Sequence, residues 1–232
     1  VLYIVLNHAG DMLAGNMAMK LAGKKGLSVR KVVTQEDISS EPRANADNRR
    51  GLVGCVAVYK IAGAAAAAGK SLDEVADIAQ YTADNMATLA VAMRGATHPV
   101  TGAVLAELPD DEMEIGMGQH GEEGGGRCKI KTADETADIM VDALVKDLEL
   151  QRGERVLLLI NGSGATTLME QLLVYRRCVK HLADLGIEVA ANYVGELLTT
   201  QEQAGFQMSM VRMNDQLLEY WNAPCNTAYF KK

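Results

Sequence analysis

Arg155-Val-Leu-Leu-Leu-Ile-Asn-Gly-Ser-Gly164 is the stretch that decides the fold class. Its apolar run, residues 156–160, is typical of a buried strand, and the glycines that follow end it in a turn. A helix comes next, opened by the capping box Thr167-Leu-Met-Glu170 and closed by Gly186, and a further strand is predicted over 188–194. Strand, helix and strand in this order are the pattern of an α/β architecture.

The Asn161-Gly-Ser-Gly164 turn lies where some α/β proteins hold a phosphate group. It lacks the Lys-Ser/Thr pair of a P-loop and does not complete a GxGxxG pattern, because positions 166 and 167 are both threonine. We therefore interpret it as a packing turn. The chain also shows no Walker A sequence and no set of kinase loops, so we expect no nucleotide site in it.

Strand-like and helix-like segments alternate over the rest of the chain as well. Capping boxes that begin at Ser71 and Thr132 open helices, which we expect to continue to about residues 87 and 148. Near Thr88 the pattern changes, so we expect one α/β unit over 1–88 and a second over 89–232. The remaining expectations are helices over 11–25 and 51–68, strands over 1–6, 29–33, 89–93, 113–117 and 208–212, and an exposed loop over 35–50.

The composition is that of a folded, acidic chain. Of its 232 residues 48% are hydrophobic and 23% are charged, which excludes a disordered protein. The net charge of −7 argues against a nucleic-acid or anionic-membrane surface. The apolar run 1–6 is too short to span a bilayer and lacks the features of a signal peptide. We expect it to be a buried parallel strand whose neighbours include sequence upstream of Val1.

The four cysteines form no CxxC pair and no close cluster with histidine. This favours reduced, buried thiols in a cytosolic setting over disulfides. His98 and His181 have no partner at the spacing of metal ligands, so we expect no zinc site.

The densest chemical signal is the segment 110–126, in which one histidine, His120, stands among glycines and carboxylates. Glycine is unfavourable in ordered structure unless the backbone takes unusual angles or approaches a ligand closely. A neutral imidazole in such a loop can act as nucleophile, base or metal ligand. The alternative is an ordinary loop histidine beside a glycine turn, and the residues alone leave both interpretations open.

Asn7-His-Ala-Gly-Asp11 follows the first predicted strand at its carboxyl end, where open α/β sheets place their ligands. Asp11 could there take a proton from a substrate hydroxyl. Asp is also a preferred N-cap residue, and a helix is predicted to begin here, so the residues alone favour the cap. His8 is either a second polar group of such a cleft or a structural histidine.

Six segments along the chain form a recognisable set: Asn7-His-Ala-Gly-Asp11, residues 51–66, Ser71-Leu-Asp-Glu-Val-Ala76, residues 111–122, Tyr193-Val-Gly-Glu196 and Asn222-Ala-Pro-Cys-Asn-Thr227. Together they resemble the substrate-binding subunit of dihydroxyacetone kinase. The resemblance runs over the whole chain, in the family's order and spacing, and only the family's N-terminal portion, with a Gly-Ser-Gly-His segment of the active site, has no counterpart.

The resemblance implies an α/β fold of two domains, the first lacking its N-terminal part, and a homodimer in the cytoplasm. It implies that dihydroxyacetone (glycerone) is held as a covalent hemiaminal on His120, and that Asp11 is the aspartate that activates the hydroxyl receiving phosphate. A partner subunit would carry ADP or ATP with magnesium, and in some members a phosphotransferase system supplies the phosphoryl group. We therefore expect this chain itself to bind no cofactor and no metal.

The sequence departs from the family at both sites. The family's Lys-Asn-Tyr-Thr-Gly-Asp is Leu6-Asn-His-Ala-Gly-Asp11 here, so a lysine that positions substrate is missing, and Glu123 replaces a proline after the histidine. Two alternatives therefore stand beside the kinase subunit. One is a catalytically silent paralogue that senses ketose and acts as a coregulator of transcription, and the other is a kinase subunit for a longer ketose such as erythrulose. We expect the chain alone to bind ketose better than it phosphorylates it.

Overall fold

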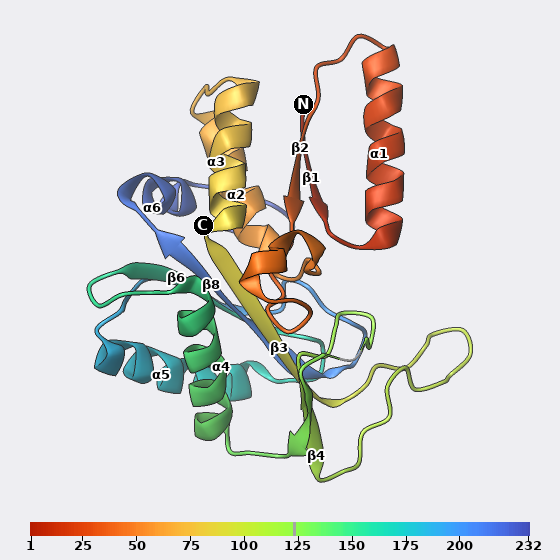
Figure 1. Ribbon diagram of the computed structural model, residues 1–232, viewed down its shortest axis with the longest axis vertical. Helices are drawn as coiled ribbons and strands as arrows, with labels where there is room; N and C mark the ends of the chain where they lie inside the picture. The colour runs from red at the N-terminus through yellow and green to blue at the C-terminus, as the bar shows by residue number, and fades with distance from the viewer. Residues whose placement is uncertain (123) are drawn as a thin grey trace.

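The computed structural model describes residues 1–122 and 124–232. Its strands form two sheets, a parallel pair and a mixed sheet of six strands in the order β5-β4-β3-β8-β6-β7 (Figure 1). The pair consists of β1 (Leu2–Leu6) and β2 (Arg30–Thr34), and the larger sheet of β3 (Met86–Arg94), β4 (Glu112–Ile115), β5 (Gly126–Lys129), β6 (Arg155–Gly162), β7 (Glu188–Gly195) and β8 (Ala204–Met213).

The strand–helix–strand unit predicted from the sequence is confirmed. β6 and β7 pair in parallel, and α5 (Leu168–Leu185) connects them. Thr167 and Glu170 form the capping box, and Gly186 ends the helix with a φ of 77°, a left-handed conformation that glycine adopts without steric penalty. The other pairings described in this sheet are antiparallel, with β8 lying between β3 and β6.

Helices cover both faces of the six-stranded sheet. Leu158 and Ile160 of β6 point to one face, and Leu157 and Leu159 point to the other, because successive side chains of a strand alternate. Both sets are fully buried, which explains why the whole run is apolar. The first face is covered by α4 (Ala133–Leu148) and α5, and the second by α2 (Cys55–Ala67), α3 (Leu72–Asp84) and α6 (Asp215–Asn222) (Figure 1).

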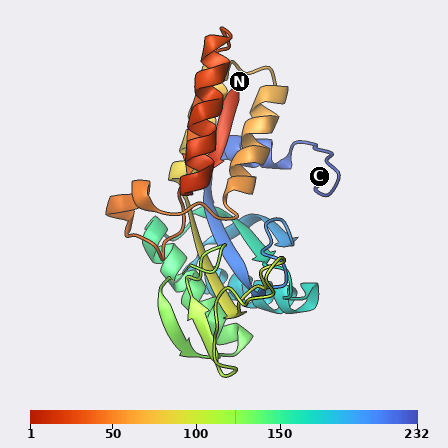
Figure 2. The same cartoon turned by 90° about the vertical axis from the view of Figure 1, so that its right-hand side faces the viewer.

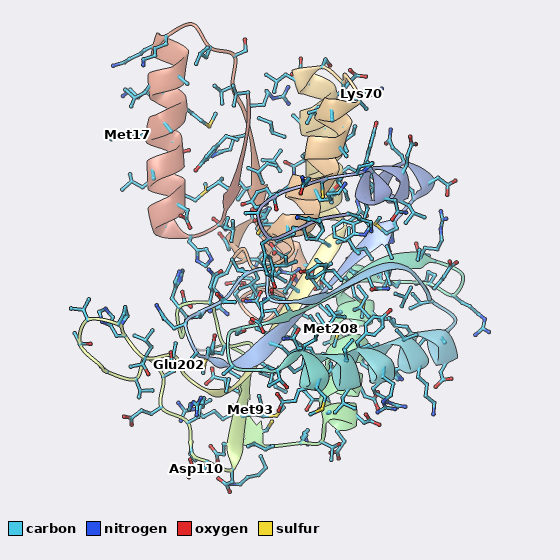
Figure 3. The ribbon with its side chains drawn as sticks, turned by 180° about the vertical axis from the view of Figure 1, so that it is seen from behind. Met17, Lys70, Met93, Asp110, Glu202 and Met208 are labelled. Carbon is cyan, nitrogen blue, oxygen red and sulfur yellow. The ribbon has the colours of Figure 1, made fainter. Side chains whose placement is uncertain are left out.

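The parallel pair and α1 (Ala9–Lys24) form a smaller layer, in which the helix lies alongside β1 (Figure 2). Gly15 is the buried residue of α1, and a side chain at this position would collide with the ring of Tyr3 in β1, so only glycine lets the helix pack this closely on the strand. The parallel strand predicted over 1–6 is confirmed, since β1 pairs in parallel with β2. The predicted burial of this strand is wrong except at Val5, because helices cover it less completely than they cover β6. Met17 on α1 is exposed, in contrast to Met208 within the core of the large sheet (Figure 3).

The segment 35–50, predicted to be an exposed loop, is partly buried. It contains a 3-10 helix, Arg43–Asn48, and the side chains of Asp37 and Arg49 are inaccessible to solvent. Arg49 donates two hydrogen bonds to Asp147 of α4, at 2.6 and 3.0 Å, and this pairing permits the burial of its charge. The prediction was wrong because partners so distant in sequence leave no local pattern.

The helix predicted to reach residue 87 ends at Asp84, because Met86 already begins β3 and pairs with Val211 of β8. The apolar patterns also fail to predict β5 and α6, which are short. The expected division at residue 88 lies within β3 and stays a prediction. Among the helices described, none has both the length and the hydrophobicity needed to cross a membrane.

Candidate functional site

His120 lies in the glycine-rich loop that follows β4. Gly116 and Gly121 have φ angles of 89° and 85°, in the region that side chains disfavour. Gly124 approaches Gly116 so closely that a side chain on Gly124 would meet the carbonyl group of Gly116. The glycines are therefore required by the backbone, which folds tightly around one histidine.

Glu122 fixes the orientation and the tautomer of His120. Its carboxylate accepts a hydrogen bond from the backbone N–H of His120 at 2.8 Å and a second from Nδ1 of the ring at 2.9 Å. A carboxylate can only accept, so Nδ1 of the neutral ring carries the proton and Nε2 keeps its lone pair. The His120 side chain is 58% exposed, which leaves this ring open to an incoming molecule.

The carboxyl group of Glu122 is held in its charged form. Partial burial raises its pKa, but hydrogen bonds from its own backbone and from His120 outweigh this effect and hold the pKa below its usual range. An anion beside Nδ1 stabilises positive charge on the imidazole, so it assists any reaction in which Nε2 acts as a nucleophile.

A second imidazole, from His8, lies against the first. The ring centroids of His8 and His120 are 4.9 Å apart and the planes meet at 77°, an edge-to-face arrangement. Nε2 of His8 lies 2.8 Å from the carbonyl oxygen of Gly51. Because a carbonyl only accepts, Nε2 is the protonated nitrogen of the neutral ring, and Nδ1 of His8 keeps its lone pair.

The segment 35–50 connects the end of β1, which carries His8, to the loop after β4, which carries His120. Asp37 and Arg50 form an ion pair at 2.8 Å, and Arg50 also donates to the carbonyl of Gly116 at 2.9 Å, where the His120 loop begins. On the other side Asn7, next to His8, donates to the carbonyl of Arg49 at 2.7 Å. The end of β1 and the loop after β4 are therefore held by one segment.

A cavity of about 320 Å³ opens beside His120, between residues 98–105 and 199–201. Thr200 donates a hydrogen bond to the carbonyl of Gln119 at 2.7 Å, and Glu202 accepts one from Thr97. Glu202 is labelled in Figure 3, at the base of the loops that form this wall. His120 thus faces a hollow suited to a small molecule.

Asp11 is not the N-cap that the residues alone favoured. The N-cap position of α1 is His8, and Asp11 lies in the first turn, exposed to solvent. Among the described residues none forms a hydrogen bond or ion pair with the side chain of Asp11, which is related to His120 only through its nearness to His8 along the chain. Its catalytic role stays a prediction.

Asn161, the first residue of the predicted packing turn, lies at the end of β6 and has a packing role. Asn161 is fully buried and accepts hydrogen bonds from the backbone N–H groups of Leu197 and Leu198, at 2.7 and 2.9 Å. It also donates to the carbonyl of Leu198 at 2.7 Å. These bonds fix the loop that leads to Thr200.

Two contacts of the site could not be predicted from local sequence, because they depend on the fold. They are the contact between the rings of His8 and His120 and the hydrogen bond of His8 to the carbonyl of Gly51. The pairing of His120 with Glu122 could have been predicted, because this carboxylate follows the histidine by two residues. The departure at Glu123 lies outside the residues that the structure describes.

Residues 1–229 match the Dak1 domain. The chain belongs to the Dak1 domain family. The dihydroxyacetone-binding subunit DhaK of PTS-dependent dihydroxyacetone kinase 2 from Listeria innocua is 37% identical to it, over 99% of this chain and 69% of that protein. The L-erythrulose kinase of Pectobacterium atrosepticum is 34% identical over 97% of this chain and 39% of that protein.

Solved structures of this family have the same α/β fold, which confirms the predicted fold class. The dihydroxyacetone kinase operon co-activator Dha-DhaQ superposes with a TM-score of 0.89 and 30% identity, over 97% of this chain and 70% of that one. The dihydroxyacetone kinase of C. freundii superposes with a TM-score of 0.82 and 27% identity, over 94% of this chain and 39% of that one. This Dak1 chain thus spans about two thirds of the curated dihydroxyacetone-binding subunits and two fifths of the erythrulose kinases.

Proposed function

We propose that this Dak1 chain is the ketose-binding part of a dihydroxyacetone kinase and holds dihydroxyacetone as a covalent hemiaminal on Nε2 of His120. The observation that carries the proposal is the hydrogen bond from Nδ1 of His120 to Glu122, which leaves the other nitrogen of this cavity-lining ring unprotonated. The names of the curated relatives supply the substrate class.

The chemistry follows from the tautomer. Nε2 forms a bond to the carbonyl carbon, and the π electrons of the C=O bond move to its oxygen. The ring becomes positively charged in this step, and Glu122, which accepts from Nδ1, stabilises the charge. The proton on Nδ1 then leaves through Glu122 to solvent while a proton from solvent reaches the oxygen. The product is a neutral hemiaminal, and no other reactant is needed.

A covalent bond of this kind selects its ligand by chemistry as well as by shape. Glycerol has no carbonyl carbon and cannot react, whereas short ketoses and aldoses can. Longer ketoses also react, so relatives named as L-erythrulose kinases fit the same bond, and the choice between three and four carbons depends on the cavity wall.

Phosphoryl transfer requires groups outside this chain. We propose that Asp11 activates the terminal hydroxyl of the bound ketose, because it lies three residues after His8 on the turn of α1 nearest the site. ADP or ATP with magnesium would come from a partner subunit in the cytoplasm, and the chain would act as a homodimer. The relatives named as binding subunits of PTS- and PEP-dependent kinases support this division of labour.

A ketose-sensing coregulator is the second candidate, favoured by two observations. The match to the operon co-activator covers 97% of the chain with a TM-score of 0.89. Leu6 occupies the position at which the dihydroxyacetone kinase family, by the resemblance described above, has a lysine. Its Cβ lies close to Gly51, whose carbonyl oxygen is hydrogen-bonded to His8. An apolar side chain at that edge cannot bind a phosphate or a developing charge.

Intact-mass spectrometry tests the shared step. The full chain incubated with dihydroxyacetone is expected to gain the mass of one molecule, and the His120→Ala variant is expected to gain none. His98→Ala, which keeps the proposed nucleophile but alters the same cavity wall, serves as the matched control and should still react. An adduct that persists in His120→Ala would contradict the proposal. Adding the nucleotide-bearing subunit then separates the candidates, since only the kinase subunit turns over.

A further inference from the structure

His8, His120 and Glu122 together form a set of metal-binding side chains. One ligand atom from each lies within 4.8 Å of the other two. The three come from the N-cap of α1 and the loop after β4, which are distant in sequence and meet only in the fold. Spacing along the chain therefore cannot reveal this cluster.

The hydrogen bonding of His8 prepares it to bind a metal. Metal-binding histidines usually donate their other ring N–H to a backbone carbonyl or a carboxylate, which fixes the tautomer and raises the basicity of the ligand nitrogen. Nε2 of His8 meets the carbonyl of Gly51 at 2.8 Å in this way, which leaves Nδ1 as the ligand. In His120 the Nδ1 proton is donated to Glu122, itself one of the three residues, at 2.9 Å. A metal bound by both would take the place of that proton, and the neutral ring would then carry its proton on Nε2.

The charge and the freedom of the side chains also suit a cation. Glu122 supplies an anionic oxygen, and the side chains of His120 and Glu122 are 58% and 39% exposed, so they can rotate. Metal–nitrogen bonds of about 2.0 Å in tetrahedral geometry require ligand atoms about 3.3 Å apart. The three ligand atoms lie within 4.8 Å of one another, so they must move closer by at most about 1.5 Å to surround one ion.

We propose that His8, His120 and Glu122 bind one divalent transition metal ion, such as Zn²⁺, and leave a coordination position open to water or a small oxygen ligand. Two imidazoles and one carboxylate favour Zn²⁺, Ni²⁺ or Cu²⁺ over Mg²⁺ and Ca²⁺, which prefer all-oxygen sites. Three protein ligands with an open fourth position are the arrangement of catalytic zinc sites.

This site competes with covalent ketose capture, a consequence that rests on the proposed function. A neutral imidazole has one lone pair, so a metal on either nitrogen of His120 removes the nucleophile. Zn²⁺ is therefore expected to suppress the dihydroxyacetone adduct, and a chelator is expected to restore it. Metal binding itself is measured without ketose, so failure of the hemiaminal does not affect it.

Titration calorimetry with Zn²⁺ and electron paramagnetic resonance with Cu²⁺, both on the chelator-treated full chain, test the metal site. We expect one ion per chain, with hyperfine coupling from two nitrogens. His8→Phe keeps a ring against His120 but removes one ligand, so it should weaken binding at least about tenfold and leave one coupled nitrogen. Glu122→Gln should also weaken binding, and it keeps the shape of the loop if His8→Phe misfolds.

The matched control is His181→Ala, which removes another imidazole that lies beside carboxylates, with Nε2 2.7 Å from Asp142. It should leave Zn²⁺ affinity unchanged. The proposal is overturned if wild-type protein takes up no Zn²⁺ or Cu²⁺, if both site variants bind as tightly as wild type, or if His181→Ala abolishes binding.

Discussion

Two glycine-rich segments at the ends of strands differ in the partners of their polar side chains. In the last turn of chain at the end of β6, Asn161 is fully buried and its amide oxygen and nitrogen are both bonded to the backbone of residues 197–198. After β4, His120 is largely exposed, and among the described residues only Glu122 is hydrogen-bonded to its ring, through Nδ1. A polar group with every partner supplied stabilises packing, whereas one that is oriented but left with a free lone pair is available for chemistry.

The largest expected effect comes from breaking the packed turn. Asn161→Leu leaves two backbone N–H groups and one carbonyl without their partner, so we expect a loss of about 3 kcal/mol in the free energy of unfolding. His120→Ala should change it by less than about 0.5 kcal/mol, as exposed substitutions do. Urea denaturation of both variants measures the contrast, and equal destabilisation would show that the two segments do not differ as described.

The buried carboxyl group of Glu36 and the partly exposed one of Glu122 should differ in how they make stability depend on pH. Burial raises the pKa of Glu36 to about 8, although its Oε1 accepts from the backbone N–H of Leu52 at 2.9 Å. At pH values between the ordinary pKa of a glutamate and about 8, Glu36 is ionised in the unfolded chain but still protonated in the folded chain. The free energy of unfolding therefore falls as pH rises toward 8, by about 1.4 kcal/mol per pH unit.

Glu36→Gln mimics the protonated carboxyl and should remove that slope. Urea denaturation at pH 6 and pH 7 measures it, with the Glu122→Gln variant as the exposed control. The pKa of Glu122 is held below its usual range, so Glu122 adds no slope in this window. A pH dependence that is the same in Glu36→Gln and wild type would contradict the burial of an uncharged carboxyl.

Removing the charge beside His120 should affect capture rather than stability. In Glu122→Gln the amide oxygen can still accept from Nδ1, but it stabilises the positive ring less than a carboxylate does. We expect dihydroxyacetone capture to slow about tenfold, equivalent to about 1.4 kcal/mol, with little change in unfolding. Time-resolved intact-mass measurements give the rate. An unchanged rate would remove Glu122 from the chemistry.

The smallest expected effect concerns the bond that links the two segments. Thr200 donates to the carbonyl of Gln119, next to His120, from the loop that Asn161 anchors. Thr200→Val removes this bond at constant shape and should cost about 1 kcal/mol in stability and slow capture only slightly. Thr199→Val, one residue earlier on the same cavity wall, is the control. A larger loss of capture than in Glu122→Gln would mean that loop position outweighs charge.

Local sequence predicted those parts of the fold that local chemistry determines. The capping boxes at Ser71, Thr132 and Thr167 are formed as predicted, because their partners are three residues away. The segment 35–50 was expected to be exposed but is partly buried, because Arg49 pairs with Asp147 far along the chain. Short elements such as β5 lack enough residues to show a period.

In the candidate site, too, the sequence predicts the residues that are close together along the chain but not the contacts made by the fold. His120 was recognised from its glycines and from resemblance, and Glu122 is visible beside it. The contact with His8 was not predictable, since it depends on how α1 and the loop after β4 are brought together. The N-cap interpretation of Asp11 was wrong because the chain enters helical geometry directly after His8.

The most direct test of the central claim is a ¹³C NMR spectrum of dihydroxyacetone labelled at its carbonyl carbon, bound to the metal-free chain. We predict that one equivalent of label leaves the ketone region and appears as a tetrahedral carbon bonded to nitrogen, in wild type but not in His120→Ala. A bound signal that remains in the ketone region, or a tetrahedral signal that survives the loss of His120, would contradict covalent capture at this histidine.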